Sequence, residues 1–362
     1  MLVFCCRPDR GTCSPPQSVF FAVRFSFRKF ADFPDFRMHA LMTFDAVSEN
    51  LSPKSQMPSA FLGASRPLMQ KTLAKAVECS GIGVHSGERV NLRLCPAAED
   101  TGVIFIRTDL FNGARAISAR WDSVVDTKMC TVIGNDHGGK VSTVEHLMAA
   151  VYACGIDNMI IEIDGSEVPV MDGSADSFVF LLEVAGSVEQ GAPKREIEIL
   201  SPVEVECKGK RARLSPYDAA RYSVTINFDR APIKTQSCDV TLSPSSFKSE
   251  VSRARTFGFF EEVDQLQKMG LARGGSLDNS IIIKGDVILN EGGLRYSNEF
   301  ARHKVLDAIG DLALAGMGIR GHFEGLCTGH ALNNRLLKAL FASPEAWRTV
   351  EASEAAFNSA LV

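Results

Sequence analysis

The sequence predicts an α+β fold of two related domains, in which each domain is a small β-sheet layered with helices and a candidate active site lies between them. Three observations predict this fold. Helix-type and strand-type patterns are interleaved from Thr72 onward. A histidine followed by a helix pattern, a glycine and a strand pattern occurs twice, at His146 and at His303. The second half is also interrupted by a stretch with the pattern of a β-α-β insert, at residues 257–283.

The first half contains a helix whose two ends are both marked in the sequence. Ser142-Thr143-Val144-Glu145 has the pattern of a capping box, with serine at the N-cap and glutamate three residues later. The helix is expected to run from His146 to about Cys154 and to end at Gly155, a favoured C-terminal residue. Alternating or β-rich runs predict strands at residues 90–94, 102–107 and 158–163.

The second half repeats this order. Apolar residues at helical spacing predict a helix over residues 302–315, about one turn longer than the first, and it is expected to end at Gly316. Residues 319–323 have the pattern of a strand. Within the insert, residues 261–269 suit a short helix, and the pair Gly274-Gly275 marks a turn before the next strand.

Composition shifts divide the chain into four parts. A polar stretch with glycine and proline, residues 188–195, is the expected boundary between the domains. The parts are an N-terminal extension (1–68), a first α+β domain (69–190), a second α+β domain with the insert (195–349) and a C-terminal tail (350–362).

The N-terminal extension differs from the rest of the chain, because eight phenylalanines lie among arginines in its first 36 positions. Three explanations stay open. The start codon is misassigned and translation begins at Met38, Met42, Met57 or Met69; the extension is disordered; or it is a targeting peptide, although acidic residues intrude.

Bulk composition excludes several classes of protein. The 362 residues carry a formal net charge of −4, without the basic surplus expected of a nucleic-acid-binding protein. No apolar run approaches the roughly 18 residues of a transmembrane helix. The ten cysteines form no C-x-x-C pair, which argues against a four-cysteine zinc site and favours a reducing cytoplasm.

Two histidines and a carboxylate form a candidate metal site. His303 and Asp307 are four residues apart in the second predicted helix, so they share one face, and Asp311 lies one turn further on. His146 would supply the third ligand from the other domain. Two imidazoles and a carboxylate leave a fourth tetrahedral position for water, as in catalytic zinc sites.

Glu145, next to His146, is the natural general base for such a water, but the capping box would use the same carboxylate. An isolated His-x-x-x-Asp on a helix is also often a surface or capping pair, and the H-E-x-x-H signature is absent. Local chemistry therefore leaves both interpretations open.

Six ordered motifs resolve this choice. They are residues 81–87 (GIGVHSG), 142–150 (STVEHLMAA), 171–174 (MDGS), 252–259 (SRARTFGF), 302–311 (RHKVLDAIGD) and 329–334 (GHALNN). Together they resemble the UDP-3-O-acyl-N-acetylglucosamine deacetylase family (LpxC), over about residues 69–349. The resemblance implies zinc-dependent removal of the N-acetyl group from an acylated UDP-sugar during lipid A synthesis, in the cytoplasm.

The resemblance also implies roles for single residues. His146, His303 and Asp307 correspond to the zinc ligands and Glu145 to the general base. His330 corresponds to the cationic group that stabilises the oxyanion and protonates the leaving amine, and Asp311 to the carboxylate that orients it. Thr256 corresponds to a residue that polarises the substrate carbonyl. Phe257, Lys304, His85 and Cys130 correspond to residues at or near the substrate.

Two further expectations concern substrate binding. The insert corresponds to the part of the family fold that holds the 3-O-acyl chain, and its candidate lining residues are Phe257, Phe259, Val263, Leu266, Met269 and Leu271. Ordinary helix packing is the alternative for each. Cys327 stands where the family often has a lysine near the nucleotide phosphates, which puts phosphate contact there in doubt. Cys130 and His85 can also be a small buried residue and a turn anchor.

Two other functions compete with the deacetylase. An amidase of the same fold acting on another acylated sugar or a peptide would have no use for an apolar insert. A binding module in which zinc only ties two domains together would have no use for an acid and a base beside the ligands, as Glu145, Asp311 and His330 would be.

Overall fold

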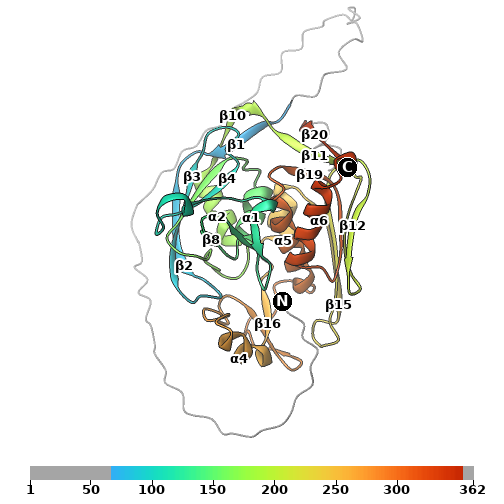
Figure 1. The fold of residues 1–362 in the computed structure, drawn as a ribbon. Coiled ribbons are helices and arrows are strands. Elements are labelled where there is room, and N and C mark those ends of the chain that lie inside the picture. Colours follow the sequence, from blue (N-terminus) through green and yellow to red (C-terminus); the bar gives the residue numbers. More distant parts are fainter. Residues whose placement is uncertain (1–66, 354–362) are drawn as a thin grey trace, which may run out of the picture. The chain divides into compact units, whose positions relative to one another are not determined.

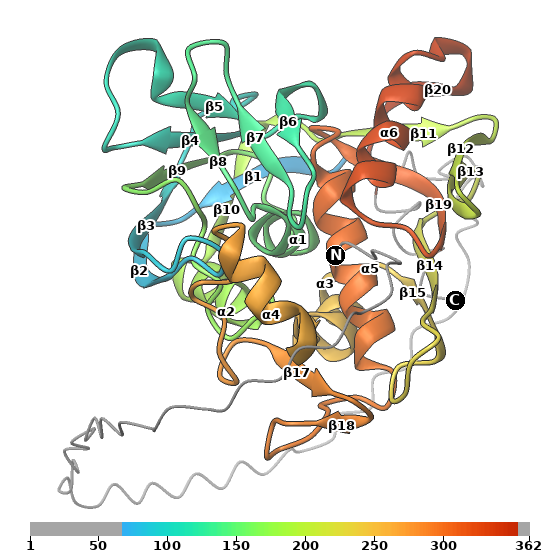
Figure 2. The ribbon, with the colours of Figure 1, turned by 60° about the horizontal axis from the view of Figure 1, so that its bottom comes forward.

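The computed structural model describes residues 67–353, and within that range the fold is α+β, as predicted (Figures 1 and 2). The alternatives for the N-terminal extension concern residues that lie almost wholly outside this range. Pro67 and Leu68, assigned above to the extension, already pair with the folded part, because the backbone N–H of Leu68 donates to the carbonyl of Ala352.

The first half of the described chain is built on a five-stranded sheet of order β2-β3-β9-β4-β5. The central strand β9 is antiparallel to β3 and parallel to β4. Two helices, α1 (Glu145–Ala153) and α2 (Asp176–Ala185), pack against each other beside this sheet. The strands are β2 (Val77–Ile82), β3 (Arg89–Pro96), β4 (Val103–Arg107), β5 (Ala116–Ser118) and β9 (Met159–Ile163).

Two smaller sheets complete this half. The first is a three-stranded sheet of order β6-β7-β8, and in the second β1 pairs with β10 in antiparallel fashion. The strands are β1 (Met69–Leu73), β6 (Val124–Asp126), β7 (Val132–Gly134), β8 (Lys140–Val141) and β10 (Ser187–Pro193). The stretch expected as a polar boundary is therefore mostly strand β10, because its backbone finds a partner in β1 that lies far away in sequence.

The second half is built on a seven-stranded sheet centred on β19, which pairs with β11, β13 and β14. The long helices α5 (Glu299–Ala313) and α6 (His330–Phe341) lie against it, α5 over β14 and β15 and α6 over β12 and β13. The strands are β11 (Arg195–Ile199), β12 (Val203–Cys207), β13 (Lys210–Ser215), β14 (Ala220–Asn227), β15 (Thr235–Thr241), β19 (Gly318–Leu326) and β20 (Trp347–Glu351). A short helix, α3 (Pro244–Ser246), follows β15.

The insert forms the predicted β-α-β unit. Strands β16 (Phe257–Phe259) and β17 (Ile281–Lys284) are parallel and are joined through α4 (Phe260–Lys268), while β18 (Val287–Ile288) is antiparallel to β17. Parallel strands need a crossover connection, which α4 supplies.

Helices α1 and α5 pack directly against each other, which brings the two repeated segments together (Figure 2). Gly310 of α5 lies close to the backbone of α1, because a Cβ there would overlap the carbonyl oxygen of Glu145 and lie 2.7 Å from its carbonyl carbon. Glycine at this position therefore sets the spacing of the two helices that carry His146, His303 and Asp307.

Three sequence expectations differ from the structure. The capping box is wrong: both the N–H and the hydroxyl of Ser142 donate to the carbonyl of Ser166, and Glu145 makes no capping bond. Helix α5 begins at Glu299 and not at residue 302, because the buried Glu299 carboxylate pairs with Arg255 at 2.8 Å. The expected tail begins as part of β20, which pairs with β11.

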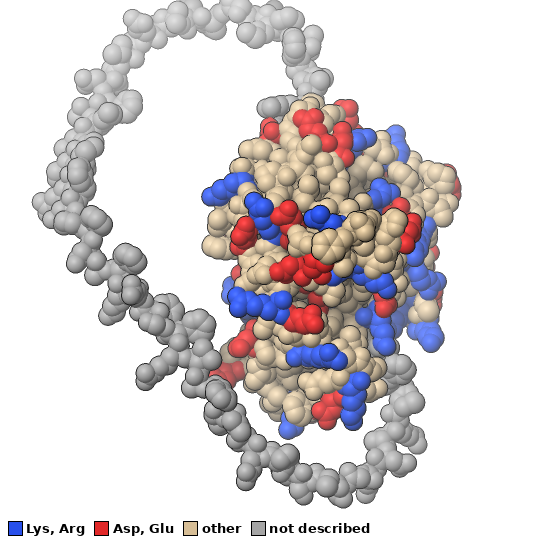
Figure 3. Space-filling view, turned by 60° about the vertical axis from the view of Figure 1, so that its left-hand side comes forward, with Lys and Arg blue, Asp and Glu red and all other residues tan. Residues whose placement is uncertain are grey.

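Among residues 67–353, no helix is both long and apolar enough to cross a membrane. On the face drawn in Figure 3, lysine and arginine side chains are interspersed with aspartate and glutamate.

Candidate active site

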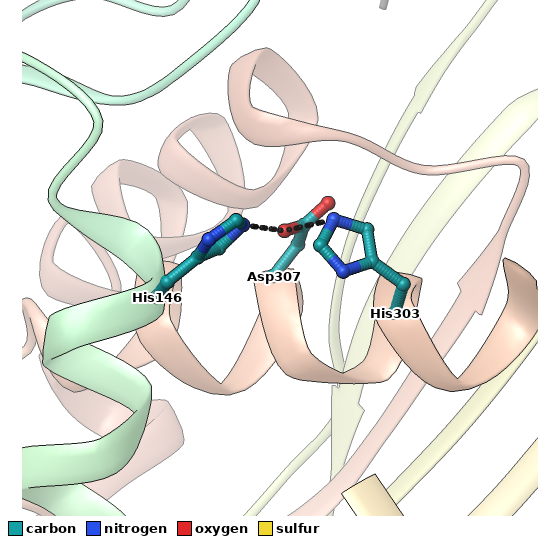
Figure 4. A group of neighbouring side chains, drawn as sticks. All are labelled: His146, His303 and Asp307. Carbon is teal, nitrogen blue, oxygen red and sulfur yellow. Dashed lines mark ion pairs between the residues drawn. The ribbon is translucent and has the colours of Figure 1, made fainter. Parts of the chain in front are cut away.

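Three predicted ligands meet where α1 lies against α5. His146 projects from the first turn of α1, and His303 and Asp307 project from successive turns of α5 toward it (Figure 4). All three are buried, and one ligand atom from each lies within 4.8 Å of the other two. The i, i+4 spacing noted in the sequence thus places His303 and Asp307 on one face, as expected.

The separations of these atoms fit a shared metal ion. Oδ1 of Asp307 lies 3.5 Å from Nε2 of His146 and 3.4 Å from Nε2 of His303. Both distances are longer than ordinary hydrogen bonds. Two ligands about 2.0–2.1 Å from one tetrahedral ion, such as zinc, lie about 3.3–3.4 Å apart. The distances from Asp307 to the two histidines are therefore compatible with a shared ion.

The surroundings of the ligands orient them. Nδ1 of His303 lies 3.0 Å from the carbonyl of Ala254, which leaves Nε2 directed at Asp307. Burial lowers the pKa of His303 to about 3, so the imidazole is neutral and its lone pair is available. Lys304 donates to Oδ2 of Asp307 at 2.5 Å, which leaves Oδ1 for a metal. Burial by itself raises the pKa of Asp307, but neighbouring charged and hydrogen-bonding groups, Lys304 among them, outweigh it and hold the pKa well below its usual range.

A carboxylate and a histidine face each other beside these ligands. Oε1 of Glu145 lies 3.6 Å from Nε2 of His330, and both side chains are buried. Burial raises the pKa of Glu145, opposed in part by His330 and His146. The pair therefore places a candidate base and a candidate acid on the same side of the His146–His303–Asp307 cluster.

Asp311 contacts the other ring nitrogen of His330, Nδ1. Its Oδ2 lies 2.9 Å from Nδ1 of His330, so the ring directs Nε2 toward Glu145. Burial alone lowers the pKa of His330, but Asp311 and Glu145 outweigh it and raise the pKa to about 9. A pKa in this range favours the cationic form of His330 at neutral pH.

Two residues of this network were missed by the sequence reasoning. Thr131 donates its hydroxyl to Oδ1 of Asp311 at 2.6 Å and its backbone N–H to Oε2 of Glu145 at 3.1 Å. Asn333 donates to Oδ2 of Asp311 at 2.8 Å. Asn333 lies in the GHALNN motif, which was a signal that could have been used, whereas nothing near Thr131 in sequence marks its contacts.

A cavity of about 140 Å³ runs from the three ligands to the insert. Three of the four predicted substrate-binding residues, Phe257, Lys304 and His85, line it. The predicted catalytic residues Glu145, Thr256 and His330 line it as well. On the insert side the lining is mostly apolar, with Phe259, Val263, Leu266 and Ile282 among its residues, and it also includes Glu262 and Ser280. Met269 and Leu271, also expected there, are not among the lining residues, and Met269 is 44% exposed.

Comparisons with known proteins agree with this geometry. The profile of the family described as UDP-3-O-acyl N-acetylglycosamine deacetylase (LpxC) matches residues 70–342. A protein of Phenylobacterium zucineum (strain HLK1) named UDP-3-O-acyl-N-acetylglucosamine deacetylase is 48% identical over 281 residues, which cover 78% of this chain and 96% of the relative. Proteins of the same name from Chromohalobacter salexigens and Haemophilus influenzae (strain 86-028NP) are 48% identical over 285 residues, covering 78% of this chain and 93% of each relative. This chain belongs to the UDP-3-O-acyl-N-acetylglucosamine deacetylase family.

Two cysteines singled out in the sequence, Cys130 and Cys327, have different surroundings in the structure. Cys130 is 4% exposed and does not line the cavity; burial raises the pKa of its thiol to about 12. Cys327 follows β19 with a φ of 48°, and its N–H donates to the carbonyl of Thr225. Neither side chain is placed against the three metal-type ligands.

His85 lies at the glycine-rich turn and also lines the cavity. Its backbone N–H donates to Oε1 of Glu167 at 2.9 Å, which anchors the glycine-rich turn, while its side chain lines the cavity. Nδ1 of His85 is buried without a hydrogen-bond partner among residues 67–353. Burial lowers the pKa of this imidazole, so it faces the cavity as a neutral group.

Proposed function

We propose that this chain hydrolyses the N-acetyl group of UDP-3-O-(3-hydroxyacyl)-N-acetylglucosamine, releasing acetate and the free amine, as a step of lipid A biosynthesis in the cytoplasm. The observation that carries the proposal is one cavity that joins a His-His-Asp cluster, an acid–base pair and an apolar extension. The names of relatives 48% identical over most of their length support the same substrate.

The three clustered side chains would hold one zinc ion, through Nε2 of His146, Nε2 of His303 and Oδ1 of Asp307. Zinc at such a site supplies Lewis-acid chemistry for activating water and an amide carbonyl. The neutral state of His303 and the ionised state of Asp307 suit these ligands.

Glu145 is the proposed general base. Its Oε2 is held by the N–H of Thr131, which leaves Oε1 toward the cavity to accept the proton of the attacking water. A buried carboxylate with a raised pKa is a stronger base than an exposed one, and that matches the task. Because Glu145 does not cap Ser142, the competing role considered for it is removed.

His330 is the proposed acid. Its cationic ring presents Nε2–H to the side of the cavity where negative charge develops on the former carbonyl oxygen, and it can then pass a proton to the leaving amine. Asp311 keeps it charged and oriented. Thr256, which lines the cavity beside Phe257, is proposed to help polarise the carbonyl.

Substrate contacts follow from the lining of the cavity. Phe257, whose ring packs under the Lys304 ammonium at 5.6 Å, and His85 are proposed to contact the sugar portion. The apolar side toward α4 is proposed to hold the 3-O-acyl chain, where each buried CH₂ contributes about 0.8 kcal/mol. Cys130, which lies outside the lining, is proposed to be a packing residue.

We also propose that the chain is divided into two domains, residues 69–190 and 195–349. The site is built from both, because His146 and Glu145 come from one and His303, Asp307 and His330 from the other. The packing of α1 against α5 supports this arrangement.

The test is acetate release from the acylated UDP-sugar by the full chain, after chelation and again after zinc is returned. We expect zinc to restore turnover in wild-type protein, and we expect Glu145→Ala to lower kcat by about 10²-fold or more, as for loss of a general base. Absence of acetate release from folded, zinc-loaded wild-type protein at several acyl lengths would overturn the substrate assignment.

A further inference from the structure

Thr131 touches both the base and the residue behind the acid. Its backbone N–H donates to Oε2 of Glu145 at 3.1 Å, and its hydroxyl donates to Oδ1 of Asp311 at 2.6 Å. The residue is 2% exposed and comes from the segment before β7, whereas Glu145 is on α1 and Asp311 is on α5. One residue therefore links three separate segments, through its backbone N–H to α1 and through its hydroxyl to α5.

The backbone of Thr131 is held independently of its side chain. Its carbonyl accepts from the N–H of Val144, at the residue before α1, and its own N–H is taken by Glu145. Strand β7 begins at the next residue and pairs with β6 and β8. A change of the side chain alone should therefore leave the bond to Glu145 in place.

The bond to Asp311 completes a full set of donors on that carboxylate. Oδ2 receives Nδ1 of His330 at 2.9 Å and Nδ2 of Asn333 at 2.8 Å, and Oδ1 lies 3.2 Å from the same His330 nitrogen. The Asn333 amide is fixed in turn, because its Oδ1 accepts from Thr328 at 2.7 Å. Without the Thr131 hydroxyl, Oδ1 would keep only the longer of its two contacts.

We propose that Thr131 is a positioning residue for the deacetylation: its hydroxyl fixes the Asp311 carboxylate against His330, and its N–H aims Oε1 of Glu145 into the cavity. The inference rests on the proposed function and adds to it a residue that touches no substrate. A carboxylate free to rotate would present His330 in more than one orientation, and small misplacements of a catalytic group lower the rate steeply.

The experiment compares Thr131→Val, which keeps the shape and removes the hydroxyl, with Thr131→Ser, which keeps the hydroxyl. The free energy of a hydrogen bond to a charged group corresponds to a loss of about 10- to 100-fold in kcat. We expect a loss of this size for Thr131→Val, with KM nearly unchanged. Thr131→Ser should stay within about threefold of wild type, since its hydroxyl can restore the bond.

Two controls separate positioning from stability. Thr72→Val removes another buried hydroxyl, which donates to the carbonyl of Asn158 at 2.7 Å far along the chain from the site, and it should lower Tm without lowering kcat. In an Asp311→Asn background, Thr131→Val should add less than about a threefold loss, because the residue acts through Asp311.

A readout without turnover keeps this inference apart from the substrate assignment. In protein labelled with ¹⁵N-histidine, the Nδ1–H resonance of His330 should move in Thr131→Val and stay in place in Thr131→Ser. Lack of acetate release by wild-type protein would count against the proposed function alone. An unmoved resonance, wild-type kcat in Thr131→Val, or an equal loss in the Asp311→Asn background would overturn the role of Thr131.

Discussion

Replacing Gly310 by alanine should separate the two helices that carry the metal-type ligands. The new Cβ would lie 2.7 Å from the carbonyl carbon and 3.0 Å from the Cα of Glu145. Carbon atoms in contact are normally about 3.5–4.0 Å apart, so α1 and α5 must part by roughly 1 Å. The obstacle is backbone, which cannot rotate away as a long side chain could.

The shift can be converted into expected magnitudes. Overpacking of this kind lowers the free energy of unfolding by about 1–3 kcal/mol, and the higher helix propensity of alanine offsets about 1 kcal/mol of that loss. Zinc binding and kcat should fall more than stability does. Ligand–metal distances vary by only about ±0.2 Å, and a 1 Å displacement of a catalytic group can lower the rate about 10²-fold. His146 follows Glu145 directly, so it moves with the helix.

The assay measures bound zinc per chain, Tm and acetate release for Gly310→Ala beside Gly292→Ala. Gly292 is a matched control, because a Cβ there would meet nothing within 4 Å and its φ is not positive. We expect weakened zinc binding and at least about 10²-fold lower kcat only for the change at residue 310. Normal zinc content and normal kcat in a folded Gly310→Ala protein would refute the claim that helix spacing sets the site.

Three further predictions address single groups. Asp311 helps raise the pKa of His330 to about 9, so the stability that this shift provides should be complete below the ordinary pKa of about 6.5 and lost as pH rises through 9. Activity that needs the charged ring should persist until the pH approaches 9. Asp311→Asn should move the alkaline limb of the kcat profile to lower pH, and an unmoved limb would contradict the assignment. Cys130 is buried and burial raises its thiol pKa to about 12, so it should resist iodoacetamide at pH 8 while the exposed Cys207 reacts. Mass spectrometry measures both modifications, and rapid labelling of Cys130 in folded protein would place it at an open surface. Leu266→Trp should fill the apolar part of the cavity and raise KM for long-acyl substrates more than for short ones, and equal effects on both would remove the acyl chain from that space.

The sequence predicted those features that depend on the pattern of residues within one segment of the chain. Helical spacing alone predicts that His303 and Asp307 share one face of a helix, and the strand, helix and glycine pattern predicts the β-α-β insert. His146 could be joined to them only through the repeated order of elements and the family motifs, because local pattern says nothing of which helices pack together. The structure adds that packing through α1 and α5.

What could not be predicted depends on contacts between distant residues. Thr131 and Asp311 are 180 residues apart, and no local signal connects them. The capping box failed for the same reason, since the N–H of Thr131 takes the Glu145 carboxylate that the motif would have used. Glu299, at the start of α5, is buried where its carboxylate pairs with Arg255, 44 residues earlier in the chain.

The most direct measurement of the central claim is a zinc titration of metal-free protein, followed by acetate release from the acylated UDP-sugar at each point. The site formed by His146, His303 and Asp307 predicts that activity rises in proportion to zinc and reaches its plateau at one ion per chain. Asp307→Ala should show neither tight binding nor activity. Full activity without metal, or unchanged zinc-dependent activity in Asp307→Ala, would contradict the account.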